Sequence, residues 1–546
     1  MKIFQPKLFG ALKSYNGKKL ANDLVAGVIV AIIALPLSIA LAIASGVSPE
    51  KGLYTAIVAG FVIAFLGGSN VNISGPTAAF ATIVAGIVAQ FGTSGLVIAT
   101  IMAGLILIVM GILKFGSLIK YIPHTITTGF TSGIALTIVI GQIKDFLGLT
   151  FPEGMPTVET AEKLEAIAHS ISTFNWQALV VGLVAMAILI VWPKISKKIP
   201  GSLIAVVVGV VMVKALSLDV NTVGDLYTIS RDLPKFSLPA FSFETVKQLV
   251  PSAFTIAILA GIESLLSCVV SDGMINDKHN SNTELIAQGV GNICSGLFGG
   301  IPATGAIART AANVKNGGRT PVSGIVHAVV LLLILVVLMP YAAWIPMPVI
   351  AAILFMVAYN MCEWRQFVKI CKTAPKSDIL VLVVTFVLTV VFDLVVAIEV
   401  GMLIAVVLFM KRMADVARIR VWKKNGEDSG ADSERLKDIP ENTQVIEFEG
   451  PMFFASSEKF NSIPFNEGVT TVILRMRNVP ALDATAMRAL YDIYRTCKAS
   501  GLTLILSHTN EQPLSVMKKA GFYDELGEEH FLPNIDAALE YAENNK

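Results

Sequence analysis

The sequence predicts a polytopic α-helical membrane protein that ends in a small soluble α/β domain. Its 546 residues are 54% hydrophobic and only 15% charged, which is too apolar for an ordinary soluble protein. Many apolar runs approach the roughly 20 residues that a helix needs to cross a bilayer. Two of these runs are each followed by a break containing Gly and Pro and then by small residues, at corresponding places in two halves.

The first half of the predicted membrane domain covers residues 23–217 and follows a basic cytoplasmic leader at 1–22. Because the leader is polar and contains several lysines, we expect no cleavable signal peptide. Hydrophobic patterning predicts seven helical segments in this half, at residues 23–45, 52–66, 77–89, 96–113, 124–143, 176–192 and 202–216.

The second half covers residues 248–412 and follows a polar extracytoplasmic connector at 218–247. It is predicted to hold seven further segments, at residues 251–271, 284–298, 304–314, 322–338, 348–361, 378–391 and 394–410. An odd number of crossings in each half inverts one half relative to the other. The sequence therefore predicts about 14 transmembrane segments in a 7+7 inverted repeat.

The distribution of lysine and arginine predicts the orientation in the membrane. With the N-terminus in the cytoplasm, the cytoplasmic loops carry basic clusters, such as Lys194 and the run from Arg365 to Lys376. The loops on the opposite side are uncharged or acidic, as the positive-inside rule requires. We therefore expect a multi-pass protein of the cell inner (plasma) membrane with both termini in the cytoplasm.

The composition changes after Arg420, where we place a linker at 413–440 and a soluble domain at 441–546. Apolar strand patterns alternate with helical patterns in this domain, which is typical of a layered α/β module. The predicted strands are 445–449, 471–476 and 502–507, and the predicted helices are 484–498 and 513–520.

The two breaks are the predicted anion-binding site. In each, an apolar helix ends at a Gly-Gly pair, a short extended piece with a proline follows, and a new helix is expected to begin near Thr77 or Thr304. A pair of such interrupted segments in two halves is the best sequence pointer to a transporter's binding site. A helix that begins inside the membrane directs free N–H groups and partial positive charge at an anion.

The predicted substrate contacts come from both breaks. Small residues allow an anion to approach the backbone N–H groups closely, and Arg309 adds a full positive charge. A structural ion pair is the alternative role for Arg309. The substrate-binding residues that we predict are Thr77, Ala78, Ala79, Thr304, Gly305, Ala306 and Arg309.

Glu263 is the predicted coupling residue, because an ionisable group inside a membrane span is energetically costly and therefore a functional candidate. Its carboxylate can take up a proton near neutral pH, or it can bind Na⁺ together with Ser267, one turn further on. A purely structural carboxylate is the alternative. Ser38 is a further candidate hydroxyl, whereas His124 and His327 are expected to pack without a role in transport.

The segments Ile73–Ala79, Gly299–Asn313 and Gly317–Thr320 resemble motifs of the SulP family of anion transporters, the sulfate-permease-like group that includes the animal solute-carrier anion exchangers. The tail is similar to a STAS domain, with Val479–Ala486 in place of its Asp-Ser-Ser/Thr-Gly loop. The resemblance covers essentially the whole chain. It implies a core domain that moves against a gate domain in an elevator-like alternating-access mechanism, in a homodimer.

The resemblance also bears on coupling and regulation. In Na⁺-dependent bicarbonate members an Asp followed by a Thr stands where this chain has Glu263 and Ser267, which favours protons here. Thr485 is a candidate regulatory phosphorylation site and could recruit a cytoplasmic partner of the STAS domain. Because Ala484 and Ala486 replace the usual Ser and Gly, a scaffold and trafficking role is the favoured alternative.

These residues predict a secondary active transporter of small anions, namely sulfate, bicarbonate or a C4-dicarboxylate, that works by H⁺-coupled symport. The alternatives are a Na⁺-coupled bicarbonate symporter and an uncoupled anion channel or exchanger. Arg309 argues against a nucleobase permease. We expect no enzyme activity, since the chain has no nucleophile–base pair, metal-ligand cluster or phosphate loop. We also expect no cofactor or metal beyond the coupling ion, and no nucleic-acid partner. The five cysteines lack metal-ligand spacing and are expected to be packing thiols.

Overall fold

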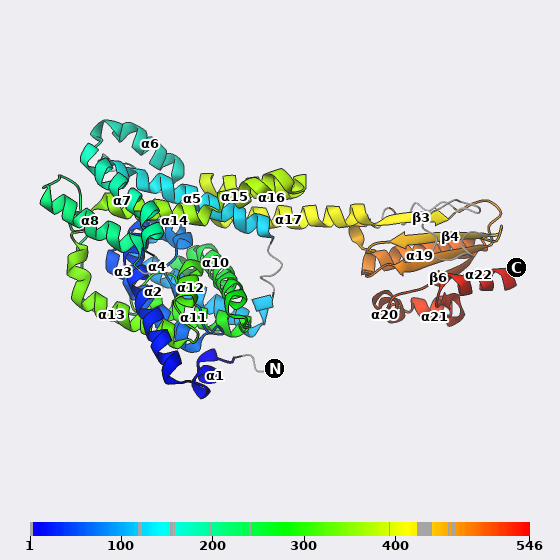
Figure 1. The fold of residues 1–546 in the computed structure, drawn as a ribbon. Helices are drawn as coiled ribbons and strands as arrows, with labels where there is room; N and C mark the ends of the chain where they lie inside the picture. The colour runs from blue at the N-terminus through cyan, green and yellow to red at the C-terminus, as the bar shows by residue number, and fades with distance from the viewer. Residues whose placement is uncertain are drawn as a thin grey trace. The chain divides into compact units, whose positions relative to one another are not determined.

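The fold was analysed in a computed structural model, drawn in Figure 1. The structure describes residues 4–545, except 118–122, 153–154, 156, 158, 197–198, 231, 240–241, 393, 423–438, 457–458 and 460–464. Contacts divide the chain into two compact units, Met1–Met402 and Leu403–Lys546. Most of the predicted linker, residues 423–438, lies outside the described residues. The predicted domain boundaries stay predictions.

Over its described residues, the first unit is mostly helical, and it also contains two very short strands. Its first half contains α1 (Lys7–Lys13), α2 (Gly17–Ala44), α3 (Pro49–Leu66), β1 (Ser74–Gly75), the 3₁₀ turn η1 (Ala78–Phe80), α4 (Ala81–Ile112), α5 (His124–Leu147), α6 (Thr160–Ser170), η3 (Ile171–Thr173), α7 (Trp176–Ile195), α8 (Gly201–Ala215) and α9 (Val223–Leu226).

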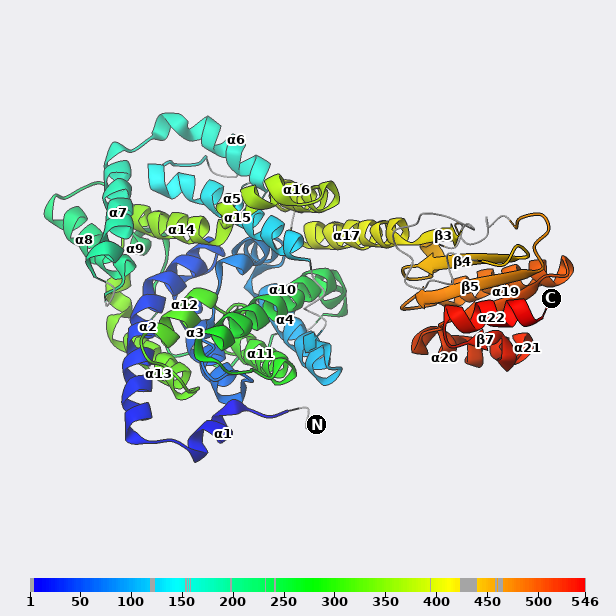
Figure 2. The same cartoon turned by 45° about the vertical axis from the view of Figure 1, so that its right-hand side comes forward.

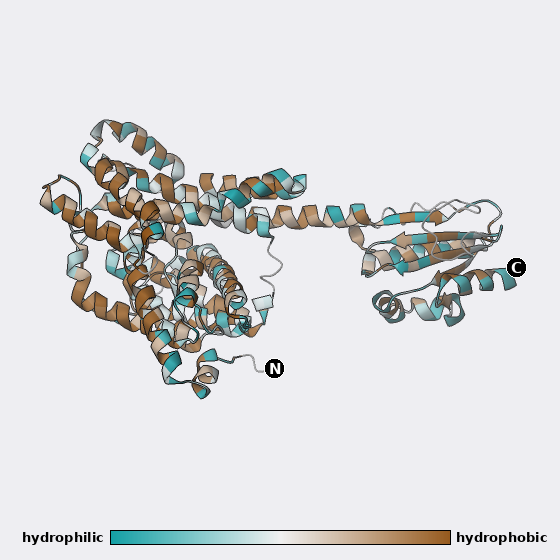
Figure 3. Cartoon of the chain, viewed as in Figure 1, coloured by the Kyte–Doolittle hydropathy of each residue, from teal (hydrophilic) through white to brown (hydrophobic). Residues whose placement is uncertain are grey.

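The second half continues with longer helices and a second short strand. It contains α10 (Phe243–Ile275), α11 (Ser281–Leu297), β2 (Thr304–Gly305), α12 (Ile307–Lys315), α13 (Val322–Ala342), α14 (Met347–Cys362), α15 (Trp364–Thr373), α16 (Lys376–Val391) and α17 (Leu394–Val416), which runs on into the second unit. Figure 3 shows that apolar residues dominate the helices of the first unit.

Every predicted membrane segment overlaps a helix. The segments predicted at 77–89 and 96–113 are two arms of α4, which bends at Gly92, where φ is +66°. Among the described residues, eight helices are long and apolar enough to cross a membrane, and the total of about 14 crossings stays a prediction. The mostly helical fold with a C-terminal α/β domain is confirmed.

Several element boundaries differ from the predictions, and three of them concern the second break, the connector and the linker. After the second break the helix begins at Ile307, later than the predicted start near Thr304, because Thr304 and Gly305 pair as β2. Helix α10 begins at Phe243, inside the predicted connector. The segment Arg418–Trp422, which we placed in the linker, forms strand β3 of the soluble domain.

The helices of the first unit pack in two groups. One group contains α2, α3, α4 and α10–α13, and the other contains α5, α7, α8, α14 and α16 (Figures 1 and 2). Small residues permit the closest approaches within the first group. A Cβ at Gly104 of α4 would lie 2.6 Å from the carbonyl oxygen of Gly289 in α11, and a Cβ at Gly289 would lie 2.5 Å from that of Gly104. Such small-residue contacts are typical of helix packing in membranes.

The soluble unit contains a five-stranded sheet with helices on both faces. Its elements are β3 (Arg418–Trp422), β4 (Thr443–Glu449), η5 (Phe454–Ser456), β5 (Thr471–Asn478), α19 (Ala484–Ala499), β6 (Thr503–Ser507), α20 (Glu511–Lys519), α21 (Phe522–Leu526), η6 (Glu528–His530), β7 (Phe531–Leu532) and α22 (Ile535–Asn544). The strand order is β3-β4-β5-β6-β7, with β3 antiparallel to β4 and the other pairs parallel.

The strands of the soluble unit alternate between two cores, as period-2 patterning requires. In β5, Val472 and Leu474 pack with α19, α20 and α21, whereas Ile473 packs with α22 on the opposite face (Figure 2). The layered α/β prediction is therefore confirmed. Cys497 is fully buried in the first of these cores, and burial raises the pKa of its thiol to about 11, so it stays a neutral packing group.

Candidate anion-binding site

The two predicted breaks lie side by side. After α3, the extended chain forms β1, and after α11 it forms β2. These strands pair antiparallel, with Ser74 opposite Gly305 and Gly75 opposite Thr304. The N–H of Ala306 also donates to the carbonyl of Ile73 at 2.8 Å. Two segments far apart in the sequence are thus joined through their backbones, and each leads directly into a new helix.

After the second break, one of the backbone N–H groups that we predicted for the anion is already used, and the helix begins later than predicted. Ala306 is the N-cap of α12 and has already donated its N–H. The first helical residues, Ile307, Ala308 and Arg309, have no carbonyl one turn before them to accept their N–H groups. Ile307 and Ala308 are also exposed in the structure. Beta pairing therefore places the start of the helix about three residues later than predicted, and the role of these N–H groups in anion binding stays a prediction.

The remaining predicted backbone contacts lie at the breaks themselves. Thr77 is half-buried just before η1, whose first residues, Ala78 and Ala79, are buried. Thr304 is buried in β2, and its hydroxyl donates to the carbonyl of Ala260 at 2.8 Å, which fixes β2 to α10. The first break thus leads into its helix through a 3₁₀ turn, and the second through an N-cap.

Arg309 extends from the first turn of α12 to the opposite break. The residue is only 2% exposed, and its Nη2 donates to the carbonyl oxygen of Pro76. Its Nε and Nη1 have no hydrogen-bond partner. A Cβ on Gly75 would lie 2.6 Å from Nη1, so the missing side chain at Gly75 provides the space for the guanidinium. A buried cation with unused donors needs an anionic or polar acceptor.

Glu263 lies in the middle of α10 and faces the same break. Its Oε2 accepts a hydrogen bond from the hydroxyl of Thr77 at 2.9 Å. Arg309 and Glu263 therefore bind neighbouring residues, Pro76 and Thr77, at the point where the first break enters its helix. Helix α12 itself packs against α2 and α10 (Figures 1 and 2).

Ser267 is placed in a different set of contacts from Glu263. Its hydroxyl donates to Oδ1 of Asn72 at 2.7 Å and lies 3.0 Å from the hydroxyl of Thr310, and Ser267 is fully buried. Thr310 also bonds to Asn72 and accepts the N–H of Ile73. Ser267 thus joins α10 to the first break and to α12, while Glu263 points to Thr77.

Sequence reasoning missed a polar stripe on α11. Glu284, Gln288 and Asn292 lie four residues apart and are all fully buried. Glu284 accepts from the N–H of Gly68 at 2.9 Å and from the side chain of Asn72 at 2.8 Å. The signal was the i, i+4 spacing of three polar residues on an apolar helix. We had used Glu284 only to mark the start of a span.

The stripe also bonds to the chain at and next to the β1–β2 pair, in both breaks. Gln288 donates to the hydroxyl of Ser74 at 3.0 Å. Asn292 accepts the N–H of Ala303 at 2.8 Å and donates to the carbonyl of Ala303 at 2.9 Å. Helix α11 therefore holds the extended chain on both sides of the β1–β2 pair, where backbone groups would otherwise lack partners.

The other candidate residues are distributed over several elements. Ser38 of α2 is 1% exposed and its hydroxyl has no partner. His327 of α13 is equally buried, with both ring nitrogens unpaired, and lies within electrostatic reach of Arg309. His124 bonds to Thr128 at the start of α5.

In the soluble unit, Asp483 is the N-cap of α19. Its side chain accepts the N–H of Ala486 at 2.9 Å and caps α19. Thr485 is exposed in the first turn of that helix, and its regulatory role stays a prediction. Over the part of the chain that the structure describes, no group of three or more His, Cys, Asp or Glu residues has the arrangement of a metal site.

The comparisons with known proteins agree with this architecture. Residues 20–385 match the Sulfate permease family, and residues 435–538 match the STAS domain. Since the first match covers more than half of the sequence, the chain belongs to the sulfate permease family of membrane anion transporters. The family resemblance read from the two breaks is confirmed, and the family consists of transporters and not of enzymes.

Two relatives and two solved structures illustrate the similarity. The putative sulfate transporter YvdB of Bacillus subtilis is 39% identical, over 96% of this chain and 98% of its own. The bicarbonate transporter BicA of Picosynechococcus is 33% identical, over 87% of this chain and 86% of its own. The transmembrane domain of a cyanobacterial BicA matches 70% of this chain and 98% of its own, with 33% identity and a TM-score of 0.62. SLC26A9 has the same fold, with a TM-score of 0.87 over 98% of this chain and 92% of its own, at 21% identity.

Proposed function

We propose that the chain is a secondary active transporter that binds a small oxyanion or carboxylate between the two breaks and carries it together with H⁺. The observation that carries the proposal is Arg309, a buried cation with two unpaired donor nitrogens at the meeting point of two helix starts. The relatives YvdB, a putative sulfate transporter, and BicA, a bicarbonate transporter, add sulfate and bicarbonate as candidate substrates. C4-dicarboxylates remain a third class, because backbone N–H groups discriminate poorly among small anions.

Three kinds of group offset the desolvation of the anion. The guanidinium of Arg309 supplies charge and two donors, Nε and Nη1. The first turns of the helices after the breaks supply free N–H groups and the positive ends of their dipoles. The short side chains of Ala78 and Ala308 leave these groups open to close approach.

Coupling to a proton follows from the position of Glu263. When its carboxylate is charged, it attracts Arg309 and repels an anion at the same break. Two unit negative charges about 7 Å apart repel each other by about 2 kcal/mol at an effective dielectric constant near 20. Protonation of Glu263 removes this repulsion, so the anion and the proton bind with positive cooperativity. That linkage is the thermodynamic requirement for symport.

The movement that we propose uses the two helix groups of the first unit. Both breaks, with Arg309 and Glu263, belong to the group of α2–α4 and α10–α13. In an elevator-like step this group moves as a body against the group of α5, α7, α8, α14 and α16, and carries the anion with it. We further propose that the protein lies in the inner membrane with both termini in the cytoplasm, and that two copies form a homodimer.

Uptake into proteoliposomes tests the proposal. Labelled sulfate, bicarbonate and fumarate are each supplied with an inward H⁺ gradient, an inward Na⁺ gradient or neither. We expect one substrate to accumulate above its equilibrium level only with the H⁺ gradient. Accumulation driven only by Na⁺ would identify Glu263 with Thr77 or Ser267 as a cation site, and large currents that ignore both gradients would indicate a channel.

A further inference from the structure

The corner between α14 and α15 turns the chain sharply. Helix α14 ends at Cys362, whose carbonyl accepts the hydroxyl of Ser132 at 2.7 Å. Glu363 follows in the left-handed region, with φ +43°, and α15 begins at Trp364. A left-handed non-glycine residue is uncommon and is kept only where the surrounding structure enforces it. The surrounding structure therefore fixes the direction of α15.

Helix α15 has three distinct faces at helical spacing. Phe367 and Ile370 form the face toward the protein, where the ring of Phe367 meets that of Phe386 in α16 with centroids 5.4 Å apart. Trp364 and Val368 form a second, apolar face and are 45% and 39% exposed. The third face is basic and exposed, and it consists of Arg365, Lys369 and Lys372.

The level of α15 relative to the bilayer follows from α16. The exposed apolar residues of α16 share one face of the helix, which fits contact with lipid tails. They are Leu380, Val383, Val387 and Val391. Lys376 precedes this stripe by one turn on the same face and is exposed. The change from apolar to basic side chains marks the boundary between the hydrocarbon and the headgroups.

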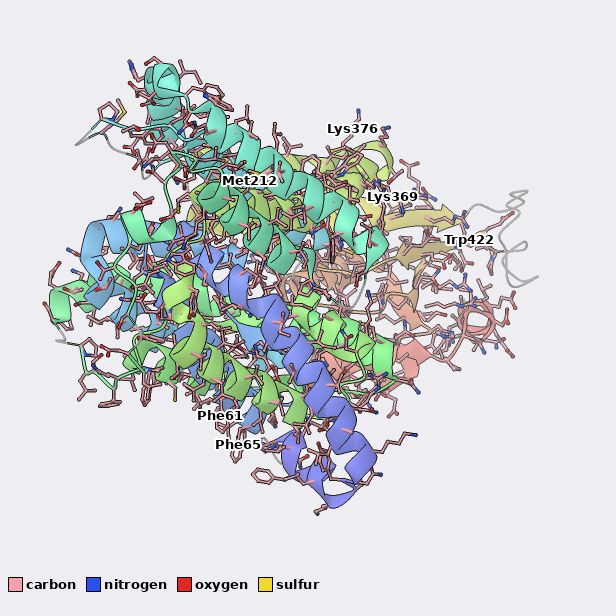
Figure 4. The ribbon with its side chains drawn as sticks, turned by 60° about the vertical axis from the view of Figure 1, so that its left-hand side comes forward. Phe61, Phe65, Met212, Lys369, Lys376 and Trp422 are labelled. Carbon is pink, nitrogen blue, oxygen red and sulfur yellow. The ribbon has the colours of Figure 1, made fainter. Side chains whose placement is uncertain are left out.

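The charge of this region is strongly positive. The sequence from Glu363 to Lys376 contains four basic residues and one acidic residue, so its net charge is 4 − 1 = +3. Figure 4 shows Lys369 of α15 and Lys376 of α16 at the same edge of the helical unit. Basic residues alone would suit a loop surrounded by water. Trp364 and Val368, however, expose apolar surface beside these charges, and contact of that surface with water is unfavourable.

We propose that α15, together with Lys376, binds anionic phospholipid of the bilayer in which the protein lies. Trp364 and Val368 insert at the level of the upper acyl chains, and Arg365, Lys369, Lys372 and Lys376 contact phosphate groups. This combination of an apolar stripe, an interfacial Trp and a flanking basic stripe is the physical pattern of interfacial helices. The surface is separate from the anion site and does not depend on which anion is transported.

The test compares a double variant in α15 with a matched control elsewhere. K369Q/K372Q removes two exposed charges, and Gln preserves helix propensity. K235Q/K247Q removes the same number of exposed charges from the opposite, extracytoplasmic side of the predicted topology. Native mass spectrometry of the full-length protein measures the retention of phosphatidylglycerol, with phosphatidylcholine as the neutral lipid. Melting temperatures in phosphatidylcholine nanodiscs verify that each variant is folded.

We expect the wild type and K235Q/K247Q to retain phosphatidylglycerol equally. In K369Q/K372Q the apparent affinity should fall on the order of 25-fold, which corresponds to about fivefold for each charge near the surface. Raised salt should weaken retention in the wild type and have a smaller effect in K369Q/K372Q, which keeps Arg365 and Lys376. Equal retention of phosphatidylglycerol by K369Q/K372Q and the wild type, or equal retention of both lipids by the wild type, would overturn the proposal.

Discussion

Arg309 is buried, but the protein satisfies only part of its hydrogen-bonding capacity. One nitrogen donates to the carbonyl of Pro76, and two others have no partner. Leaving a buried cation partly unpaired costs several kcal/mol, which a bound anion can recover. The space for the guanidinium exists because Gly75 has no side chain. At the residue scale, the candidate site is therefore a buried guanidinium group, which fits beside the first break because Gly75 has no side chain.

Adding a methyl group at Gly75 tests this geometry. In Gly75→Ala the new Cβ would lie 2.6 Å from Nη1 of Arg309, so the guanidinium must shift. Gly75 has no positive φ, so alanine adds no backbone strain. We expect the apparent KM for the transported anion to rise about tenfold, as measured by initial uptake rates. Gly86→Ala is the control, because its Cβ meets nothing within 4 Å. Equal effects of the two substitutions would contradict the role of Gly75.

Replacing Glu263 by glutamine tests coupling. Glu263→Gln keeps the hydrogen bond to Thr77 but removes the group that gains and loses a proton. We expect accumulation driven by an H⁺ gradient to fall to the equilibrium level, while exchange of labelled for unlabelled substrate stays within about threefold of the wild type. Proteoliposomes prepared with and without the gradient separate the two activities. Uphill accumulation by this variant at the wild-type level would exclude Glu263 as the proton carrier.

Residue by residue, the sequence predicted charges better than backbone donors. Arg309 and Glu263 were recognisable because charged residues in apolar spans are rare and costly. The start of the helix after the second break was predicted about three residues too early, because the β1–β2 pair forms between segments more than two hundred residues apart. Glu284 was overlooked because it lies near the start of its span, where a carboxylate also suits a helix N-terminus.

At the element scale, α11 acts as the scaffold of both breaks. Its stripe of Glu284, Gln288 and Asn292 bonds to Asn72 and Ser74 of the first break and to Ala303 of the second. These bonds give buried polar groups of the breaks a hydrogen-bond partner. Irregular backbone at membrane depth is tolerated only under that condition. The breaks are therefore held in place by side chains of α11.

Removing the side chain of Asn292 tests this scaffold. Asn292→Ala leaves the N–H and C=O of Ala303 unsatisfied, which should cost about 2–5 kcal/mol of stability. We expect a lower melting temperature in detergent and a loss of substrate affinity together. The matched control is Asn316→Ala, which removes a single side-chain bond to Ala312 at the end of α12. A melting temperature for Asn292→Ala as high as for Asn316→Ala would exclude the scaffold role.

Elements with strong apolar periodicity were predicted well. Elements whose structure depends on contacts with other segments of the chain were not. All segments predicted in the membrane domain overlap helices, because an apolar run of that length has few other stable states. Helix α15 was not predicted, because its residues lie in a segment that we interpreted as a basic loop. Strand β3 was also not predicted, because its five residues lie in the predicted linker. Their alternating burial identifies a strand only once their pairing with β4 is known.

At the scale of the whole molecule, the soluble unit has cores of its own. Strand β3 contributes Trp422, which is 6% exposed and packs with Ile439 and Val445. Its Nε1 donates to Glu447 at 2.9 Å, and Glu447 also accepts from Arg475 at 3.2 Å. The sheet is therefore complete only when the chain just after α17 is included.

Two soluble fragments test the contribution of β3. We expect residues 417–546 to unfold cooperatively in urea. Residues 439–546 lack Trp422 and expose the edge of β4, so this fragment should be less stable by about 3–5 kcal/mol or should aggregate. Urea titrations followed by circular dichroism measure both. Equal midpoints for the two fragments would place β3 outside the folding unit.

In the proposed mechanism, Arg309 holds the anion between two joined helix starts. The most direct measurement is the equilibrium affinity of purified Arg309→Ala and Arg309→Lys for the transported anion. We expect Arg309→Ala to lose about 10- to 100-fold in affinity, and Arg309→Lys to recover only part, since lysine lacks the planar fork. Without substrate, the melting temperature of Arg309→Ala should equal or exceed that of the wild type, because an unpaired buried cation is removed. Unchanged affinity with a lower melting temperature would instead make Arg309 a structural residue and contradict the account.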